Sequence, residues 1–117
     1  MQSLGRATDL IDRTPRITAA SLAEQLSSPE SPLLIDVRAQ QEWRGRRIDG
    51  AINVPLSRLG DQLGEIPTDR SIVVYCTSGY RSAIAASVMR REQVREVADL
   101  VGGLGAWESA QLETVET

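Results

Sequence analysis

Apolar and polar positions divide this 117-residue chain into two kinds of segment that follow one another in turn. Short segments that are apolar at consecutive positions predict strands buried on both faces of a sheet. Segments with apolar residues three or four positions apart predict helices. The predicted strands are 33–35, 51–54, 71–75 and 97–101, and the predicted helices are 18–26, 40–44, 56–66, 82–92 and 106–110.

Regular alternation of strands and helices begins near Ile17 and continues to the last predicted helix. Strands that are apolar on both faces are typical of a parallel sheet with helices on both sides. The sequence therefore predicts a single α/β domain over 14–117. The residues before it show neither sustained periodicity nor a clear helix cap, and we interpret 1–13 as a flexible arm or linker.

Composition restricts the chemistry that such a domain can perform. The chain has one cysteine and no histidine. A lone cysteine excludes an internal disulfide, a Cys-x-x-Cys redox pair and a cysteine-rich zinc site. Without histidine there is no Ser-His or Cys-His catalytic pair and no histidine metal cluster. Nucleophilic chemistry at the cysteine would therefore depend on backbone dipoles and arginines for its activation.

Charge and hydropathy narrow the partners and the location. The formal net charge is -3 and the chain has no long basic run, which argues against nucleic acid as its main partner. No run of about 18 apolar residues predicts a membrane span. The polar N-terminus also lacks the apolar core of a signal peptide. We therefore expect a cytoplasmic protein whose free thiol stays reduced.

The single cysteine, Cys76, lies between the strongest predicted strand and the strongest predicted helix. In open α/β sheets, ligands bind beyond the carboxyl ends of the strands. Backbone N–H groups at a helix start lack partners within the helix, and the helix dipole places partial positive charge there. A loop curled around the sulfur could aim those N–H groups at it, and Arg81 adds a full positive charge. Gly79 gives the loop the backbone freedom that a tight cradle requires.

Free cysteines are often small core residues, and this is the alternative interpretation of Cys76. Its neighbours argue against that interpretation, because small polar residues, a glycine and an arginine follow it before the helix begins. Such a segment is a poor choice for a core. The position therefore favours a reactive thiol.

Four segments occur in one order along the chain. Residues 34–38 read Leu-Ile-Asp-Val-Arg and are followed by Glu42-Trp43, and residues 48–55 read Ile-Asp-Gly-Ala-Ile-Asn-Val-Pro. Residues 76–81 read Cys-Thr-Ser-Gly-Tyr-Arg, and residues 101–107 read Val-Gly-Gly-Leu-Gly-Ala-Trp. In this order they resemble the motifs of rhodanese-like sulfurtransferases, with the cysteine segment as the active-site loop. The resemblance covers nearly the whole chain, from Ile17 to Leu112.

The resemblance implies an α/β fold with a five-stranded parallel sheet flanked by helices, and sulfur transfer without a cofactor or a metal. Cys76 would attack the outer sulfur of a small anionic donor such as thiosulfate, or of a persulfide, and hold it as a persulfide. A thiol or a protein would accept that sulfur in the cell, and cyanide would accept it in an assay. The implied substrate-binding loop consists of Thr77, Ser78, Gly79, Tyr80 and Arg81. In it, Arg81 would bind the donor and close the loop.

Asp36 and Arg38, at the end of the predicted strand 33–35, are the implied supporting residues. An aspartate there could act as a general base. The resemblance favours a structural role instead, in which the two side chains orient loops through hydrogen bonds and ion pairs. Arg38 would also add positive potential near the mouth. The family usually has Gly-His where this chain has Arg46-Arg47, which we interpret as a solvated surface turn.

Two other functions fit parts of the pattern. Phosphatases and arsenate reductases of the same fold place five residues between their cysteine and arginine, whereas four separate Cys76 from Arg81. The shorter loop suits a single sulfur atom better than a phosphate-sized anion. The second alternative is a regulatory or binding module of a larger sulfur-metabolism protein. The loop also resembles rhodanese domains fused to persulfide dioxygenases of the metallo-β-lactamase fold.

Overall fold

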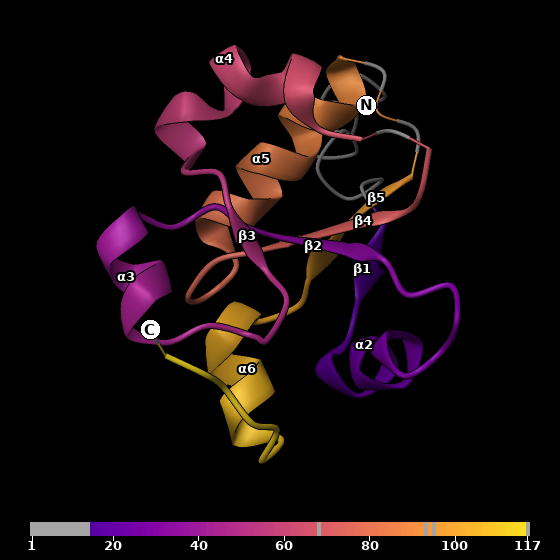
Figure 1. Ribbon diagram of the computed structural model, residues 1–117, viewed down its shortest axis with the longest axis vertical. Coiled ribbons are helices and arrows are strands. Elements are labelled where there is room, and N and C mark those ends of the chain that lie inside the picture. The colour runs from indigo at the N-terminus through magenta and orange to yellow at the C-terminus, as the bar shows by residue number, and fades with distance from the viewer. Residues whose placement is uncertain (1–14, 68, 93, 95, 117) are drawn as a thin grey trace, which may run out of the picture.

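A computed structural model of the chain describes residues 15–67, 69–92, 94 and 96–116. The predicted arm, 1–13, lies outside the described residues. Five parallel strands form one sheet in the order β1-β5-β4-β2-β3 (Figure 1). The strands are β1 (Arg16–Ile17), β2 (Leu33–Asp36), β3 (Ile52–Asn53), β4 (Ile72–Tyr75) and β5 (Val97–Leu100). The predicted five-stranded parallel α/β fold is confirmed.

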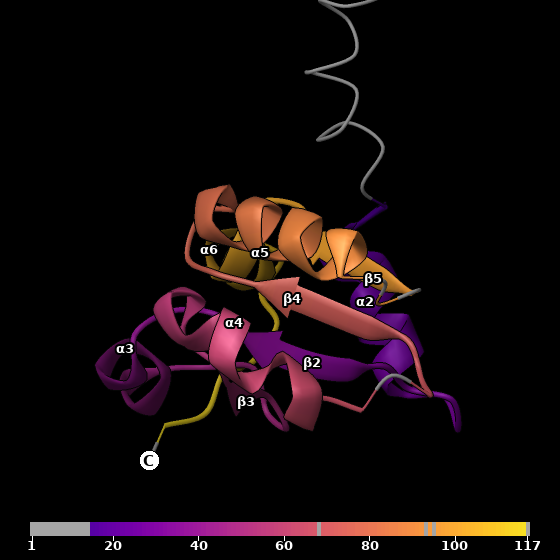
Figure 2. The same ribbon diagram turned by 90° about the horizontal axis from the view of Figure 1, so that it is seen from above.

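Helices cover both faces of this sheet. They are α2 (Ala19–Leu26), α3 (Gln40–Gly45), α4 (Leu59–Gln62), α5 (Tyr80–Arg91) and α6 (Gly103–Ser109). Helices α4 and α5 lie on one side, and α2 and α6 lie on the other (Figure 1). Helix α5 runs along β4 and β5, which places its first turn next to the carboxyl end of β4 (Figure 2).

Successive strand residues pack into two different apolar clusters. On β2, Leu34 contributes to the cluster beneath α2 and α6, and Ile35 contributes to the cluster beneath α4 and α5. On β4, Val73 contributes to the cluster beneath α2 and α6, and Val74 contributes to the cluster beneath α4 and α5. Because side chains alternate across a strand, a strand buried on both sides must be apolar at successive positions. This is the physical reason for the consecutive apolar runs in the sequence.

Two elements differ from the sequence prediction. Strand β1 was not predicted, because two residues are too few to show a pattern, and its pairing with β5 is what holds it in the sheet. The segment predicted as one helix over 56–66 instead forms α4 between two short 3-10 turns. Gly60 and Gly64 lower the helix propensity of this segment, so it forms separate short turns rather than one continuous helix.

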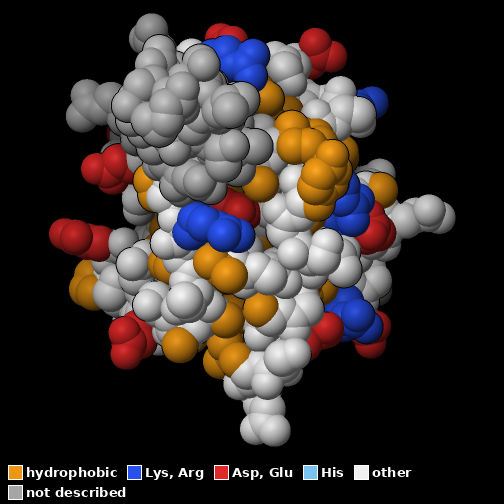
Figure 3. Space-filling model, turned by 180° about the vertical axis from the view of Figure 1, so that it is seen from behind, with side chains coloured by type: hydrophobic (Ala, Val, Ile, Leu, Met, Phe, Trp, Pro, Cys, Tyr) orange, Lys and Arg blue, Asp and Glu red, His pale blue; other side chains and the backbone are white. Residues whose placement is uncertain are grey.

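The surface carries charges of both signs. Figure 3 shows the face seen from behind, where acidic and basic side chains are interspersed with apolar ones. In the part of the chain that the structure describes, no helix has the length and apolar character needed to cross a membrane.

Candidate active site around Cys76

Cys76 directly follows β4, at the edge of the sheet where the carboxyl ends of the parallel strands meet. The side chain is buried, and the chain then turns through Gly79 into α5. Gly79 has a φ of 111°, a conformation that residues with a side chain rarely adopt. Helix α5 begins at Tyr80, two residues earlier than predicted, so Tyr80 and Arg81 belong to its first turn.

The sulfur of Cys76 accepts hydrogen bonds from the backbone. The N–H groups of Gly79 and Ser82 donate to Sγ at 3.1 and 3.3 Å. Both groups lie at the start of α5, where the helix has no partner of its own for them. Together with the helix dipole, they favour negative charge on the sulfur or on an atom bound to it. The predicted backbone cradle is therefore present in the geometry.

A second backbone segment holds the cysteine loop from the side of α6. The N–H of Leu104 donates to the carbonyl of Cys76 at 2.7 Å, and the N–H of Gly105 donates to that of Thr77 at 3.0 Å. Gly103 allows this close approach, because it has a φ of 60° and a Cβ placed on it would lie 2.3 Å from the Cys76 oxygen. The sequence indicated only a turn at this position.

Arg81 points to a carboxylate from another element. Its guanidinium donates to the two carboxylate oxygens of Glu42, on α3, at 2.9 and 3.2 Å. A further contact runs to the hydroxyl of Thr77 at 3.4 Å. Glu42 raises the pKa of Arg81, and Arg81 in turn lowers the pKa of Glu42. In the sequence, Glu42 is only part of a motif, and nothing there predicts that it neutralises the loop arginine.

Three loop residues form the rim of the site. Thr77, Ser78 and Tyr80 are all exposed, and the Tyr80 side chain is 76% accessible. An exposed tyrosine beside a buried thiol presents a flat, partly apolar surface to whatever approaches. These exposed side chains are therefore available to whatever approaches the cysteine loop.

Asp36 and Arg38 form a buried ion pair. The guanidinium of Arg38 donates to both carboxylate oxygens of Asp36, at distances of 2.7 to 3.1 Å, and the Arg38 N–H donates to Oδ1 at 2.9 Å. Another guanidinium N–H donates to the carbonyl of Arg46. Because Arg38 is paired with Asp36, its charge is not free at the mouth. The two residues fix the chain after β2, which is the structural role that the resemblance favours.

A buried carboxylate that the sequence analysis missed lies beside the cysteine. Asp99, on β5, accepts a hydrogen bond from the hydroxyl of Ser82 at 2.5 Å. The same hydroxyl oxygen is 3.5 Å from Cys76 Sγ. Burial raises the pKa of the Asp99 carboxyl, and the hydrogen bond from Ser82 and the charge of Arg16, 3.7 Å away, partly offset this rise. The available sequence signal was a single charged residue within an otherwise apolar strand.

The arginines at 46 and 47 are anchored rather than free. Arg46 makes an ion pair with Glu108 of α6 at 2.5 Å. The guanidinium of Arg47 lies 4.3 Å from the centre of the Trp43 ring, and its backbone pairs with Val115. The two arginines thus tie the segment between β2 and β3 to the C-terminal end of the described chain. Arg46 is exposed and Arg47 is half-buried, so the segment lies at the surface, as the sequence predicts, and these contacts hold it there.

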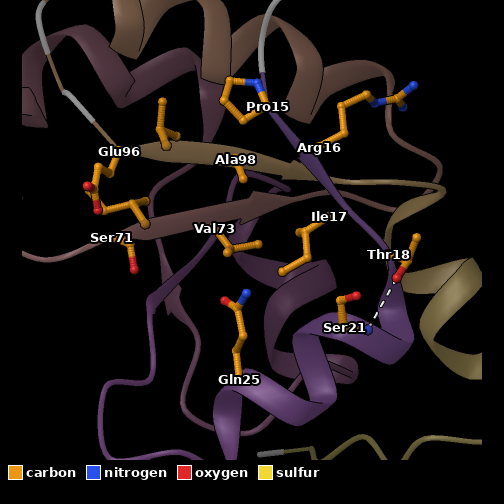
Figure 4. A pocket seen from close by; sticks show the side chains of 12 residues that line it. Pro15, Arg16, Ile17, Thr18, Ser21, Gln25, Ser71, Val73, Glu96 and Ala98 are labelled. Atoms are coloured by element: carbon orange, nitrogen blue, oxygen red, sulfur yellow. Dashed lines mark hydrogen bonds between the residues drawn. The ribbon is translucent and has the colours of Figure 1, made fainter.

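A hollow of about 600 Å³ lies elsewhere on the molecule. Its lining comes from β1, α2 and the first residues of β4 and β5, including Ile17, Gln25 and Ala98 (Figure 4). Cys76 lies past the opposite end of β4, so this hollow is not the entrance to the thiol. Among the described residues, no cluster of three or more Asp, Glu, Cys or His side chains is arranged to hold a metal ion.

The sequence and the fold both match known proteins. Residues 18–110 match the rhodanese-like domain family. A sulfurtransferase of Allochromatium vinosum is 35% identical over 91 residues, covering 78% of this chain and 85% of that protein. A probable adenylyltransferase/sulfurtransferase MoeZ of Mycobacterium tuberculosis is 39% identical over 93 residues, covering 78% of this chain but only 24% of that protein. The crystal structure of a rhodanese-related protein from Thermoplasma volcanium superposes with a TM-score of 0.78 at 26% identity, covering 88% of this chain and 99% of that one.

Proposed function

This chain belongs to the rhodanese-like domain family, and we propose that it transfers a sulfane sulfur through a persulfide on Cys76. The proposed donor is a small anion such as thiosulfate, or a persulfide. The proposed acceptor is a thiol or a protein in the cell, with cyanide as the acceptor in an assay. No metal or cofactor takes part in the proposed reaction.

The observation that carries this proposal is the pair of N–H groups that donate to Cys76 Sγ, at 3.1 and 3.3 Å. A thiolate is the reactive form of cysteine, and a persulfide anion carries its charge on the outer sulfur. Fixed N–H donors at a helix start stabilise both without reorganising during the reaction. With four residues between Cys76 and Arg81, the loop is also small, as a cradle for a single sulfur atom should be.

The first half-reaction forms the persulfide. The sulfur of Cys76 attacks the outer sulfur of thiosulfate, and a new S–S bond forms. The old S–S bond breaks, and its electron pair leaves with sulfite. Arg81 supplies positive charge at the rim for the anionic donor once Glu42 releases it, because the donor and Glu42 compete for one guanidinium.

The second half-reaction passes the outer sulfur to an acceptor. A second cysteine in the chain would allow an internal disulfide to form, but Cys76 is the only one. The acceptor must therefore come from outside, and it meets the exposed ring of Tyr80 as it enters. A free thiol that must stay reduced between cycles suits the cytoplasm, which is the location we propose.

Steady-state assays with thiosulfate and cyanide test this function. Two half-reactions that share one enzyme-bound intermediate predict parallel double-reciprocal plots. Cys76→Ser should abolish thiocyanate formation, and Asp61→Asn, which changes an exposed residue of α4 outside the cysteine loop, should keep most of it. Intersecting plots, or full activity in Cys76→Ser, would exclude the persulfide route.

A binding or carrier module within a longer protein is a second candidate. It is favoured by one observation, which is that the chain corresponds to only 24% of the matched MoeZ protein. In that case Cys76 would accept sulfur from an attached or partner domain rather than from thiosulfate. No turnover with thiosulfate, combined with persulfide formation from a protein persulfide donor, would favour the module over the free enzyme.

A further inference from the structure

A row of hydrogen bonds connects Cys76 to a carboxylate that the two half-reactions above do not use. Ser82 Oγ is 3.5 Å from Cys76 Sγ and 2.5 Å from Asp99 Oδ1. All three side chains are buried, at 1%, 0% and 2% accessibility. They come from the loop after β4, from α5 and from β5, so the pairing of β4 with β5 fixes their spacing.

The direction of these hydrogen bonds follows from the atoms involved. Ser82 has one hydroxyl proton, and an ionised carboxylate can only accept. Two acceptors lie within reach of that proton, Asp99 Oδ1 at 2.5 Å and the carbonyl oxygen of Gly79 at 3.3 Å. The shorter contact to the charged carboxylate takes the proton, which leaves a lone pair of Ser82 Oγ facing the sulfur. The thiol proton of Cys76 is then directed at Ser82 Oγ. A proton on the sulfur thus has a continuous path to a buried carboxylate.

We propose that Asp99 receives the thiol proton of Cys76, through Ser82, when the sulfur attacks its donor. This inference rests on the proposed sulfur-transfer function. As the new S–S bond forms, the thiol proton passes to Ser82 Oγ, and the hydroxyl proton of Ser82 passes to Asp99 Oδ1. The bond within thiosulfate breaks, and its electron pair leaves with sulfite. The total charge of the site and donor does not change.

Proton transfer leaves the hydrogen bond between Cys76 and Ser82 and that between Ser82 and Asp99 in place, each with its direction reversed. Asp99 then donates to Ser82, and Ser82 donates to the sulfur. In the persulfide, the negative charge that left Asp99 lies on the outer sulfur bound to Cys76, next to the N–H groups of Gly79 and Ser82 that donate to Sγ. When the acceptor takes the outer sulfur, the proton can return to Cys76 by the same path. Asp99 acts through Ser82 as a positioning residue, in a chain that has no histidine for this task.

The charges around this path suit a proton acceptor. Burial raises the pKa of Asp99, which brings the carboxyl closer to a thiol in proton affinity. The hydrogen bond from Ser82 limits that rise, and so does Arg16 on β1, which lies 3.7 Å from the second carboxylate oxygen. On the other side, Arg81 of α5 interacts electrostatically with Cys76, and it is paired with Glu42.

The test is the rate of Cys76 alkylation by iodoacetamide as a function of pH, in the full chain. If the relay operates, one proton is shared between Cys76 and Asp99, and a constant fraction of molecules holds a thiolate together with a protonated Asp99. The wild-type alkylation rate should therefore show a step, a range of mildly acidic pH in which it no longer falls. In Asp99→Asn this step disappears, and the rate falls about tenfold per pH unit below a single midpoint. Ser82→Ala, which keeps the charge of Asp99, should lose the step as well. Asp61→Asn, which removes an exposed carboxylate of α4, should keep it.

The relay would be overturned if the wild-type alkylation rate followed a single titration without a step. It would also be overturned if Asp99→Asn kept the step unchanged. The wild-type profile decides the matter even if neither buried variant folds. Alkylation needs no sulfur donor, so this test is separate from that of the proposed function. A step that depends on Asp99, with no thiosulfate turnover, would remove the proposed function and keep the relay. Thiosulfate turnover together with a single titration in the alkylation profile would remove the relay and keep the proposed function.

Discussion

The carboxylate of Glu42 and the guanidinium of Arg81 form a two-point ion pair at the mouth of the Cys76 loop, with N–O distances of 2.9 and 3.2 Å. The pair joins α3 to the first turn of α5. Both side chains are more than a third accessible, so a second anion can compete for the arginine. Glu42 therefore occupies the cation that an anionic sulfur donor needs.

Removing that competitor should strengthen donor binding. Glu42→Gln keeps the size of the side chain and removes its charge. An exposed ion pair contributes up to about 1 kcal/mol, so we expect the KM for thiosulfate to fall about two- to fivefold. Steady-state kinetics at low ionic strength measure this change. Glu108→Gln, which breaks the Arg46–Glu108 ion pair instead, is the matched control and should leave KM unchanged. An equal fall in KM in both variants would show that the lower net negative charge of the protein, and not the release of Arg81, strengthens donor binding.

A side chain at position 103 should push the cysteine loop out of place. Gly103→Ala puts a Cβ 2.3 Å from the carbonyl oxygen of Cys76 and forces alanine to a φ of 60°. We expect a loss of about 2 to 4 kcal/mol in the free energy of unfolding, together with a loss of activity. Gly60→Ala in α4, where nothing lies within 4 Å, should cost nothing and serves as control. Urea unfolding of both variants measures the difference, and equal stabilities would contradict the clamp.

The positions of these glycines show what the sequence could and could not predict. The consecutive apolar runs predicted β2, β4 and β5, and the placement of Cys76 between a strand and a helix predicted its cradle. A glycine pair, by contrast, indicates only a turn. That Gly103 presses against the backbone of Cys76 depends on how α6 returns to the sheet, which no local pattern encodes.

The partners of Arg81 and Asp99 are the other feature that the sequence did not reveal. Arg81 was predicted as a free cation, but its partner Glu42 precedes it by 39 residues and meets it only because α3 and α5 share one edge of the sheet. Asp99 looked like an isolated polar residue in an apolar strand. Its position beside Ser82 follows from the register of β4 with β5, which tertiary structure alone determines.

Breaking the buried ion pair after β2 should destabilise the fold. Arg38→Met leaves the carboxylate of Asp36 buried without its cation, which costs about 3 kcal/mol or more. Arg46→Gln removes a cation whose side chain is 61% accessible, and should cost less than about 1 kcal/mol. Urea unfolding at neutral pH compares the two. A double variant, Asp36→Asn with Arg38→Met, should recover part of the loss, because no unpaired charge remains. A larger effect at Arg46 than at Arg38 would contradict this assignment.

Stability should depend on pH through Asp99. Burial raises the pKa of this carboxyl above its ordinary value of 3.8, so the folded state binds the proton more tightly than the unfolded state. The contribution of Asp99 is then fully present below about pH 4 and is lost as the pH rises through the folded-state pKa. Asp99→Asn cannot titrate, so the wild-type unfolding free energy minus that of the variant should fall between acidic and neutral pH. A difference that grows with pH in this window would show that the carboxylate, not the acid, is favoured by folding.

The most direct measurement is the intact mass of the protein after incubation with thiosulfate and removal of excess donor. A persulfide on Cys76 predicts a gain of about 32 Da, lost on adding cyanide or dithiothreitol. The same incubation should leave the mass of Cys76→Ser unchanged. An unchanged wild-type mass with both thiosulfate and a persulfide donor, or an equal gain in Cys76→Ser, would contradict sulfur transfer through this cysteine.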